Sequence, residues 1–201
     1  MSQQPHIVAE QNALEAPEDG KKYTYADYAK WDDGKRWELI EGVSYLMSPA
    51  PTYNHQSMLI ELGYQFRHFL RDKPCKVFWA PFDVRLNGAG DDDDTVVQPD
   101  LLVICDLSKL TKTGCEGAPD LVVEILSPGT ARHDRLVKFR LYKNAGVKEY
   151  WIIDPELKIV SVNILNAGRY ISSAYGDTDI VPVSVLEELS ITMVDVFADL
   201  L

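Results

Sequence analysis

Two apolar runs in the chain each contain one acidic residue at a position where the surrounding pattern predicts burial. Residues 98–105 (QPDLLVIC) contain Asp100, and residues 119–128 (PDLVVEILSP) contain Glu124. Short runs rich in Val, Ile and Leu are typical of strands that are covered on both faces. An unpaired ionised carboxylate in such a strand is strongly destabilising. The pattern therefore predicts that a metal ion or a basic side chain lies near these two acids.

The remaining pattern predicts a sheet between helices. Apolar positions at helical spacing predict a helix over residues 53–72, and residues 130–146 (TARHDRLVKFRLYKNAG) predict a second helix that ends at Gly146. The second helix separates the Glu124 strand from the apolar run 148–154 (KEYWIID), so these two strands are expected to be parallel neighbours. Short turns between the other strands favour antiparallel pairs. We therefore predict an α/β (α+β) fold in which a mixed β-sheet is flanked by helices on both faces.

Length and composition indicate one globular domain. The chain has 201 residues, of which residues 1–22 are polar and contain proline. We expect these to form a flexible N-terminal arm before a single domain over residues 23–201. No apolar run approaches the ~20 residues of a membrane span, so no membrane partner is expected. Three cysteines, Cys75, Cys105 and Cys115, form no CxxC pair, which favours reduced thiols in a cytoplasmic protein.

The acidic balance of the chain limits its partners. The formal net charge of −11 disfavours a nonspecific nucleic-acid binder, because phosphate contacts supply most of the affinity of such proteins. A local basic surface or a metal ion can reverse the field inside a cleft, so nucleic acid remains a candidate partner. The acidic run at residues 91–94 (DDDD) lies in a glycine-rich loop, and we expect it to be solvated rather than to form a cation site.

The helix that follows Glu124 contains a candidate cation for the buried acids. Asp134, Lys138 and Tyr142 are four residues apart and therefore lie along one face. One interpretation is an Asp134–Lys138 pair on the surface, and the other is a lysine that points inward at Asp100 and Glu124. Two acids on neighbouring strands can also hold one divalent cation through oxygen ligands. In a third arrangement one acid meets water at a strand end, the other pairs with a basic side chain, and no metal is needed.

Three stretches of the chain together resemble a known family. They are residues 37–62 (WELIEGVSYLMSPAPTYNHQSMLIEL), 96–106 (VVQPDLLVICD) and 117–155 (GAPDLVVEILSPGTARHDRLVKFRLYKNAGVKEYWIIDP). This pattern resembles the Uma-type family of restriction-endonuclease-like proteins, which belongs to the PD-(D/E)xK nuclease superfamily. The resemblance covers residues 24–200, and the long third stretch is its most specific part.

The acids of the superfamily motif match particular residues of this chain. Pro99-Asp100 matches the PD pair, and Glu124 matches the acid that starts the (D/E)xK triplet on the next strand. A second PD pair, Pro119-Asp120, lies only four residues before Glu124 and cannot occupy a separate strand. We therefore rank it below the first pair.

The triplet departs from the family pattern at its last position. It reads Glu124-Ile125-Leu126, so the motif lysine is absent, and Lys138 on the following helix is the expected substitute. The resemblance implies an endonuclease that uses Mg²⁺ (or Mn²⁺) to hydrolyse phosphodiester bonds, with DNA as the expected substrate. Asp100, Glu124 and the backbone carbonyl of Ile125 would hold the metal. Lys138 would orient the attacking water or stabilise the charge that develops on phosphorus.

Several further residues are candidates for supporting roles: His55, Gln98, Glu41, Asp134 and Tyr142. His55 falls on the inward face of the first predicted helix, either as a core histidine or near the cleft. The superfamily often draws one extra acid from the region of Glu38 and Glu41, although either can be an ordinary surface acid. Gln98 shares a strand face with the first motif acid and can contact a metal-bound water.

Two other functions remain open at this point. A noncatalytic domain of the same fold would bind protein or nucleic acid. A metal-dependent hydrolase of a small phosphate ester would suit the acidic surface better than long DNA does. A homodimer is also expected.

Overall fold

The computed structural model describes residues 17–18, 20–47, 50–127, 129 and 133–201. The N-terminal arm predicted for residues 1–22 falls mostly outside this part of the chain. The same holds for residues 130–132, where the second predicted helix was expected to begin. Within the described part, no helix is both long enough and apolar enough to span a bilayer.

The central sheet contains both apolar runs in which the sequence places Asp100 and Glu124. In spatial order its strands are β12 (Arg169–Tyr175), β11 (Ile159–Asn166), β10 (Glu149–Asp154), β9 (Leu121–Ile125), β6 (Leu101–Ile104) and β3 (Lys76–Trp79). β9 runs parallel to β10 and antiparallel to β6. The mixed sheet and the parallel crossover predicted from the pattern are therefore confirmed.

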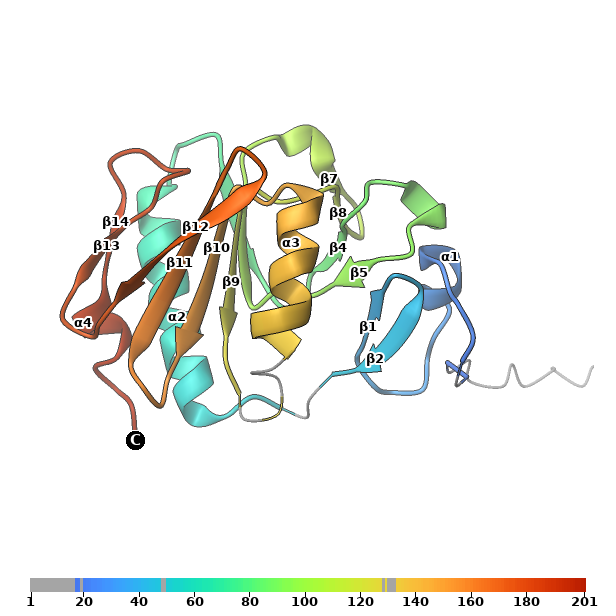
Figure 1. Ribbon diagram of the computed structural model, residues 1–201, viewed down its shortest axis with the longest axis horizontal. Helices are drawn as coiled ribbons and strands as arrows, with labels where there is room; N and C mark the ends of the chain where they lie inside the picture. Colours follow the sequence, from blue (N-terminus) through green and yellow to red (C-terminus); the bar gives the residue numbers. More distant parts are fainter. Residues whose placement is uncertain (1–16, 19, 48–49, 128, 130–132) are drawn as a thin grey trace, which may run out of the picture.

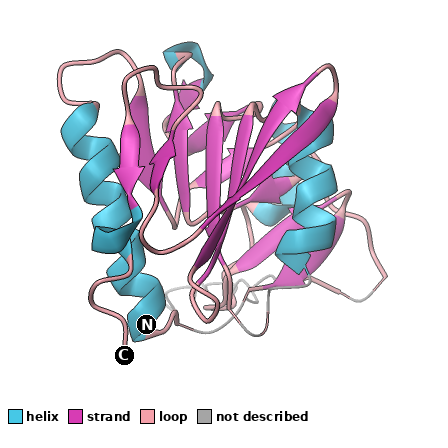
Figure 2. Ribbon diagram, turned by 60° about the vertical axis from the view of Figure 1, so that its left-hand side comes forward, coloured by secondary structure: helices cyan, strands magenta, loops and turns pink. Residues whose placement is uncertain are grey.

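Helices cover both faces of the central sheet, as Figures 1 and 2 show. The α-helices described are α1 (Tyr25–Tyr28), α2 (Tyr53–Phe69), α3 (Phe139–Ala145) and α4 (Met193–Val196). Leu62 of α2 belongs to the same buried core as Val123 of β9, whereas Tyr142 of α3 belongs to the core of Val122. Successive side chains of a strand point to opposite faces, so β9 is buried on both sides. The apolar residues of β9 on either side of Glu124 follow from that burial.

A second sheet continues beyond the central one, where the sequence predicted a single sheet. In spatial order its strands are β2 (Val43–Leu46), β1 (Trp37–Ile40), β5 (Val96–Val97), β4 (Asp83–Arg85), β8 (Gly114–Glu116) and β7 (Leu110–Thr111). β13 (Ile180–Pro182) and β14 (Ser190–Thr192) form a separate pair. The run expected to be one strand around Asp100 is divided between β5 and β6. Pro99 lies at the division, and proline cannot donate to a sheet ladder.

The helix after β9 is not uniform. Residues His133–Lys138 form a π-helical turn (η3), and α3 begins directly after it. The sequence predicted one uninterrupted α-helix here. Gly146 ends α3 in the left-handed conformation at φ 88°, as expected for a C-terminal glycine. Short 3₁₀ turns, η1 (Gly90–Asp92) and η2 (Leu107–Lys109), occur in the loops.

The expectation of three reduced cysteines is wrong for two of them. Cys75 and Cys105 form a disulfide across β3 and β6. The antiparallel register pairs Lys76 with Ile104, so Cys75, directly before β3, lies opposite Cys105, directly after β6. Cys115 is a buried free thiol, and burial raises its pKa to about 11. The cysteines therefore no longer support a cytoplasmic location.

Glu149 is a buried carboxylate at the start of β10 that holds the C-terminal segment. Its Oε1 accepts a hydrogen bond from Trp151 Nε1 at 2.8 Å, and its Oε2 accepts one from the Val185 N–H at 2.9 Å. Burial raises the pKa of Glu149, although these donors oppose the shift. Glu149 is therefore protonated more readily in the folded chain than in the unfolded one.

We expect Glu149→Gln to flatten the pH dependence of stability. A carboxyl with a raised folded-state pKa contributes stability that is lost as pH rises from its unfolded value through the folded one. The free energy of unfolding of the wild type should therefore fall more than that of the variant as pH rises above 4.5, the usual pKa of a glutamate side chain. Urea unfolding across this range measures both profiles. Parallel profiles would show that Glu149 does not titrate in the folded chain.

Candidate active site

The carboxylate of Asp100 contacts both the end of β9 and a side chain of α2. Its Oδ2 accepts a hydrogen bond from the backbone N–H of Ile125 at 2.7 Å. The same oxygen lies 3.1 Å from Nε2 of His55, whose side chain is largely buried. Nδ1 of His55 is also buried, and it has no hydrogen-bond partner among the described residues. The histidine thus faces the motif acid rather than the core.

The end of the β6–β9 ladder leaves a backbone oxygen beside Asp100. The ladder stops where Leu101 pairs with Val123. Two residues further along the same register, Ile125 would face Pro99, which has no N–H. The Asp100 carboxylate accepts the Ile125 N–H instead. Since the N–H and C=O of a paired strand residue point to the same side, the Ile125 carbonyl faces this edge without a donor from Pro99.

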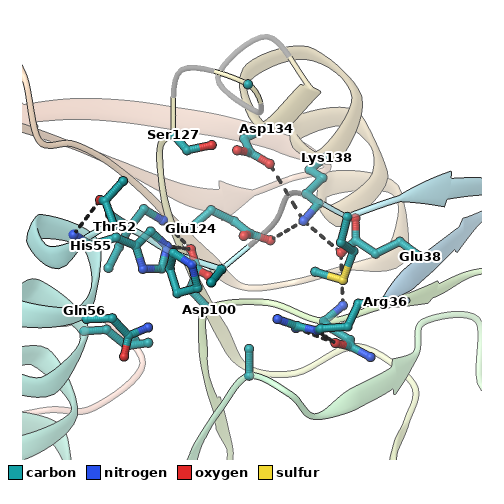
Figure 3. A pocket seen from close by; sticks show the side chains of 18 of the residues that line it. Arg36, Glu38, Thr52, His55, Gln56, Asp100, Glu124, Ser127, Asp134 and Lys138 are labelled. Carbon is teal, nitrogen blue, oxygen red and sulfur yellow. Dashed lines mark hydrogen bonds and ion pairs between the residues drawn. The ribbon is translucent and has the colours of Figure 1, made fainter. Parts of the chain in front are cut away.

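Glu124 lies at the centre of a buried charge cluster (Figure 3). Its Oε1 accepts hydrogen bonds from Lys138 Nζ at 3.0 Å and from the Tyr142 hydroxyl at 2.7 Å. Lys138 Nζ also lies 2.9 Å from Glu38 Oε1 and 3.7 Å from Asp134 Oδ1. The Asp134–Lys138 pair is therefore part of a buried cluster and not a surface pair.

The cluster keeps Lys138 charged. Burial alone lowers the pKa of its ammonium, but the carboxylates of Glu124, Glu38 and Asp134 outweigh burial and hold that pKa well above its usual value. Burial raises the pKa of Glu124 well above its usual range, against the opposing effect of Lys138. Burial likewise raises the pKa of Tyr142, which remains a neutral donor to Glu124. One cation is thus shared by three acids.

The Asp100–His55 pair and the charge cluster around Glu124 line the same cleft, which has a volume of about 540 Å³. Asp100, Glu124, Ile125 and Lys138 all line it. In Figure 3, His55 of α2 enters from one side of the carboxylates, and the residues near β1 enter from the other. The cleft therefore lies where α2, β9, the π turn and the β1–β2 hairpin meet.

The oxygen atoms at the cleft suit a hard divalent cation. Asp100 Oδ1 and Glu124 Oε2 have no hydrogen-bond partner among the described residues. With the Ile125 carbonyl they form the kind of all-oxygen donor set that Mg²⁺ prefers, completed by water. Among the described residues, no three His, Cys, Asp or Glu side chains are grouped to hold an ion. Any metal here would therefore depend on two carboxylates and one carbonyl.

Two supporting residues occupy different roles from those expected. Glu41 lies in the β1–β2 turn at φ 49°, solvent-exposed and outside the lining of the cleft, so the structure does not bring it together with the other candidates. Glu38 is the acid that the β1–β2 region contributes to the cleft. It lies within β1 and accepts the Gln98 backbone N–H at 3.1 Å. The Gln98 side chain bonds to Arg36 and Asp83 rather than projecting freely toward Asp100. No sequence signal separated these roles.

The other acidic candidates lie away from the cleft. Asp120 accepts the Cys105 N–H at 2.7 Å and the Lys148 ammonium at 2.6 Å, at the opposite end of β9 from Glu124. Asp93 of the acidic run is buried and accepts the N–H of Thr95 at 2.9 Å. The expectation that the whole run is solvated is therefore wrong for Asp93, which closes its own loop.

Comparison with known proteins identifies the family. Residues 25–194 match Uma2, a family described as "Putative restriction endonuclease". The chain belongs to the Uma2 family. The Synechocystis sp. protein "Uncharacterized protein slr1290" is 30% identical over 135 residues, which span 66% of this chain and 68% of that protein. The family resemblance proposed from the sequence is thereby confirmed.

The fold is shared with a solved structure. A crystal structure from Anabaena variabilis, titled as "a putative nuclease belonging to DUF820", matches with a TM-score of 0.69. The match covers 87% of this Uma2 chain and 97% of that chain at 21% sequence identity. The nuclease-like α+β fold predicted from the sequence is therefore confirmed.

Proposed function

We propose that this Uma2 protein is a Mg²⁺-dependent endonuclease that hydrolyses phosphodiester bonds of DNA. The observation that carries the proposal is the meeting of Asp100, Glu124 and Lys138 in one cleft. They come from the residue directly before β6, from β9 and from η3. If Lys138 and Glu124 formed only a structural ion pair, a second acid, Asp100, would not be needed in the same cleft. The family description and the nuclease-like fold support the same activity.

Asp100, Glu124 and the carbonyl of Ile125 would hold Mg²⁺ or Mn²⁺ in this proposal. A bound ion supplies a Lewis acid for a phosphoryl oxygen and lowers the pKa of a water molecule. The protein contributes fixed ligand positions, because two strands and their hydrogen bonds hold the donors. His55 keeps the Asp100 carboxylate turned toward the end of β9.

Lys138 is the proposed substitute for the missing motif lysine. Its ammonium carries a fixed positive charge to the cleft and holds Glu124 in one orientation. Such a preorganised charge stabilises the anionic phosphorus centre as it forms and orients the attacking water. Tyr142 and Asp134 position the lysine and its partner acid.

We expect calorimetry to detect a weak divalent site that Asp100→Asn removes. The substitution takes away one of two carboxylate ligands, and affinity for a hard cation depends strongly on ligand charge. Asp92→Asn provides a matched control, since Asp92 is an exposed acid of the loop run. Binding that survives Asp100→Asn but is lost in Asp92→Asn would place the cation in that loop instead.

A small phosphate ester is the second candidate substrate, favoured by the net charge of −11. Supercoiled plasmid and bis(p-nitrophenyl) phosphate, assayed side by side in Mg²⁺, distinguish the two. Turnover of the ester alone would favour the small-substrate hydrolase, and metal binding with neither activity would favour a noncatalytic domain. A homodimer and a cytoplasmic location also belong to the proposal, and the dimer is testable by light scattering.

A further inference from the structure

Arg36 is a cation of the cleft that forms no ion pair with an acid in the described part of the chain. Arg36 and Lys138 are the lysine and arginine side chains that line the cleft within the described residues. Lys138 is surrounded by carboxylates, as described above. Arg36 forms no ion pair with any described carboxylate. Its positive charge therefore remains available to an anion that enters the cleft.

Hydrogen bonds hold both the backbone and the guanidinium of Arg36. Its backbone carbonyl accepts the Met47 N–H at 2.9 Å, which extends the β1–β2 ladder by one residue pair. Its Nη2 and Nε donate to Oε1 of Gln98 at 2.6 and 3.2 Å. Gln98 is oriented in turn, because its Nε2 donates to Asp83 at 2.8 Å and to the Tyr28 hydroxyl at 3.0 Å. This hydrogen-bond chain sets the guanidinium before any ligand arrives.

The guanidinium of Arg36 has N–H groups that Gln98 does not bind. A guanidinium has five N–H groups, and only Nε and Nη2 are used by Gln98. Arginine binds phosphate oxygens through such planar, paired donors. The acids Glu38, Asp100 and Glu124 would repel a nucleic-acid backbone at this cleft. An arginine fixed on the wall opposite His55 offsets that repulsion (Figure 3).

We infer that Arg36 is a substrate-binding residue that contacts a backbone phosphate of the nucleic acid, with Gln98 as its positioning residue. This inference rests on the proposed function and adds a recognition element to it. Neither residue belongs to the metal-binding set. Loss of Arg36 should therefore weaken substrate binding while the bound substrate is still cleaved.

The test is the affinity of a fluorescently labelled DNA duplex, measured by anisotropy in Ca²⁺ over a range of salt concentrations. Arg36→Gln should raise Kd by about tenfold, the usual effect of one charged hydrogen-bonding contact. It should also reduce the slope of log K against log salt by about 0.9, the contribution of one neutralised phosphate. Arg36→Lys keeps the charge but loses the paired donors, so its Kd should rise while its salt slope stays close to that of the wild type.

Lys35→Gln is the matched control. Lys35 is adjacent in sequence, its side chain is 58% exposed, and it pairs with Asp33 at 3.8 Å. It does not line the cleft, so its removal should change Kd by less than about twofold, as for a distant surface charge. Since Arg36 is exposed, all variants should keep the wild-type melting temperature.

Equal Kd values and equal salt slopes for the wild type and Arg36→Gln would overturn the inference. Failure of the wild type to bind the duplex would overturn it as well. Cleavage in Mg²⁺ is measured separately. A wild type that binds through Arg36 but does not cleave contradicts the proposed nuclease and leaves the role of Arg36 intact. In a cleaving enzyme, Arg36→Gln should raise KM and leave kcat nearly unchanged.

Discussion

Lys138→Met is expected to slow Mg²⁺-dependent cleavage strongly and to destabilise the chain by about 3–5 kcal/mol, the usual effect of breaking a buried ion pair. Three carboxylates would lose their shared cation, all of them buried beside the cleft. The cleavage rate should fall by about 10²–10³-fold, as for loss of one preorganised electrostatic group. Urea unfolding and single-turnover cleavage measure the two effects.

The stability loss in Lys138→Met should depend on pH. In the wild type, the raised pKa of Lys138 keeps its contribution present at neutral pH, and this contribution is lost only as pH rises through that pKa. Lys138 lowers the pKa of Glu124, so without the ammonium that pKa should rise further and the folded variant takes up a proton more readily. The deficit should therefore be smaller near about pH 5 than near about pH 8.

Tyr142→Phe is the control for Lys138→Met. It removes one donor to the same Glu124 oxygen but keeps the lysine. We expect a loss of about 1 kcal/mol and a stable fold. If Lys138→Met were as stable and as active as Tyr142→Phe, Lys138 would be neither a structural cation nor a catalytic one.

The sequence predicted those parts of the fold that local patterns determine. The apolar runs of β6 and β9, the helical stripe of α2 and the crossover to β10 are all visible in the order of apolar and polar residues. The division of the strand at Pro99 was not predicted, although proline was a visible signal. The Cys75–Cys105 disulfide depends on the register of β3 and β6, which no local pattern specifies.

The sequence also predicted part of the candidate site. The four-residue spacing of Asp134, Lys138 and Tyr142 indicated a shared face, and the structure places all three at Glu124 or its lysine. Glu41 is exposed in the turn after β1, whereas Glu38 within that strand lines the cleft, and no local pattern distinguished the two acids. Arg36 could not be distinguished from Lys35 in the sequence, since its orientation comes from Gln98, 62 residues away.

Glu124→Gln should abolish cleavage while the fold survives. Glutamine has the same shape, and its carbonyl oxygen can still accept the Lys138 and Tyr142 hydrogen bonds. Lys138 also keeps Glu38 and Asp134 as partners. The substitution removes one of the two proposed carboxylate ligands and with it a unit of negative charge. The rate should therefore fall by a factor on the order of 10³, as expected when an essential group of the chemistry is lost.

The proposed active site is tested most directly by the rate of supercoiled plasmid cleavage by wild type and Glu124→Gln, assayed in parallel in Mg²⁺ and in EDTA. We expect nicked and linear products from the wild type in Mg²⁺ alone, and almost none from the variant, with equal melting temperatures for both proteins. Equal cleavage by the two proteins, or no Mg²⁺-dependent cleavage by the folded wild type, would contradict the assignment of this cleft as a nuclease active site.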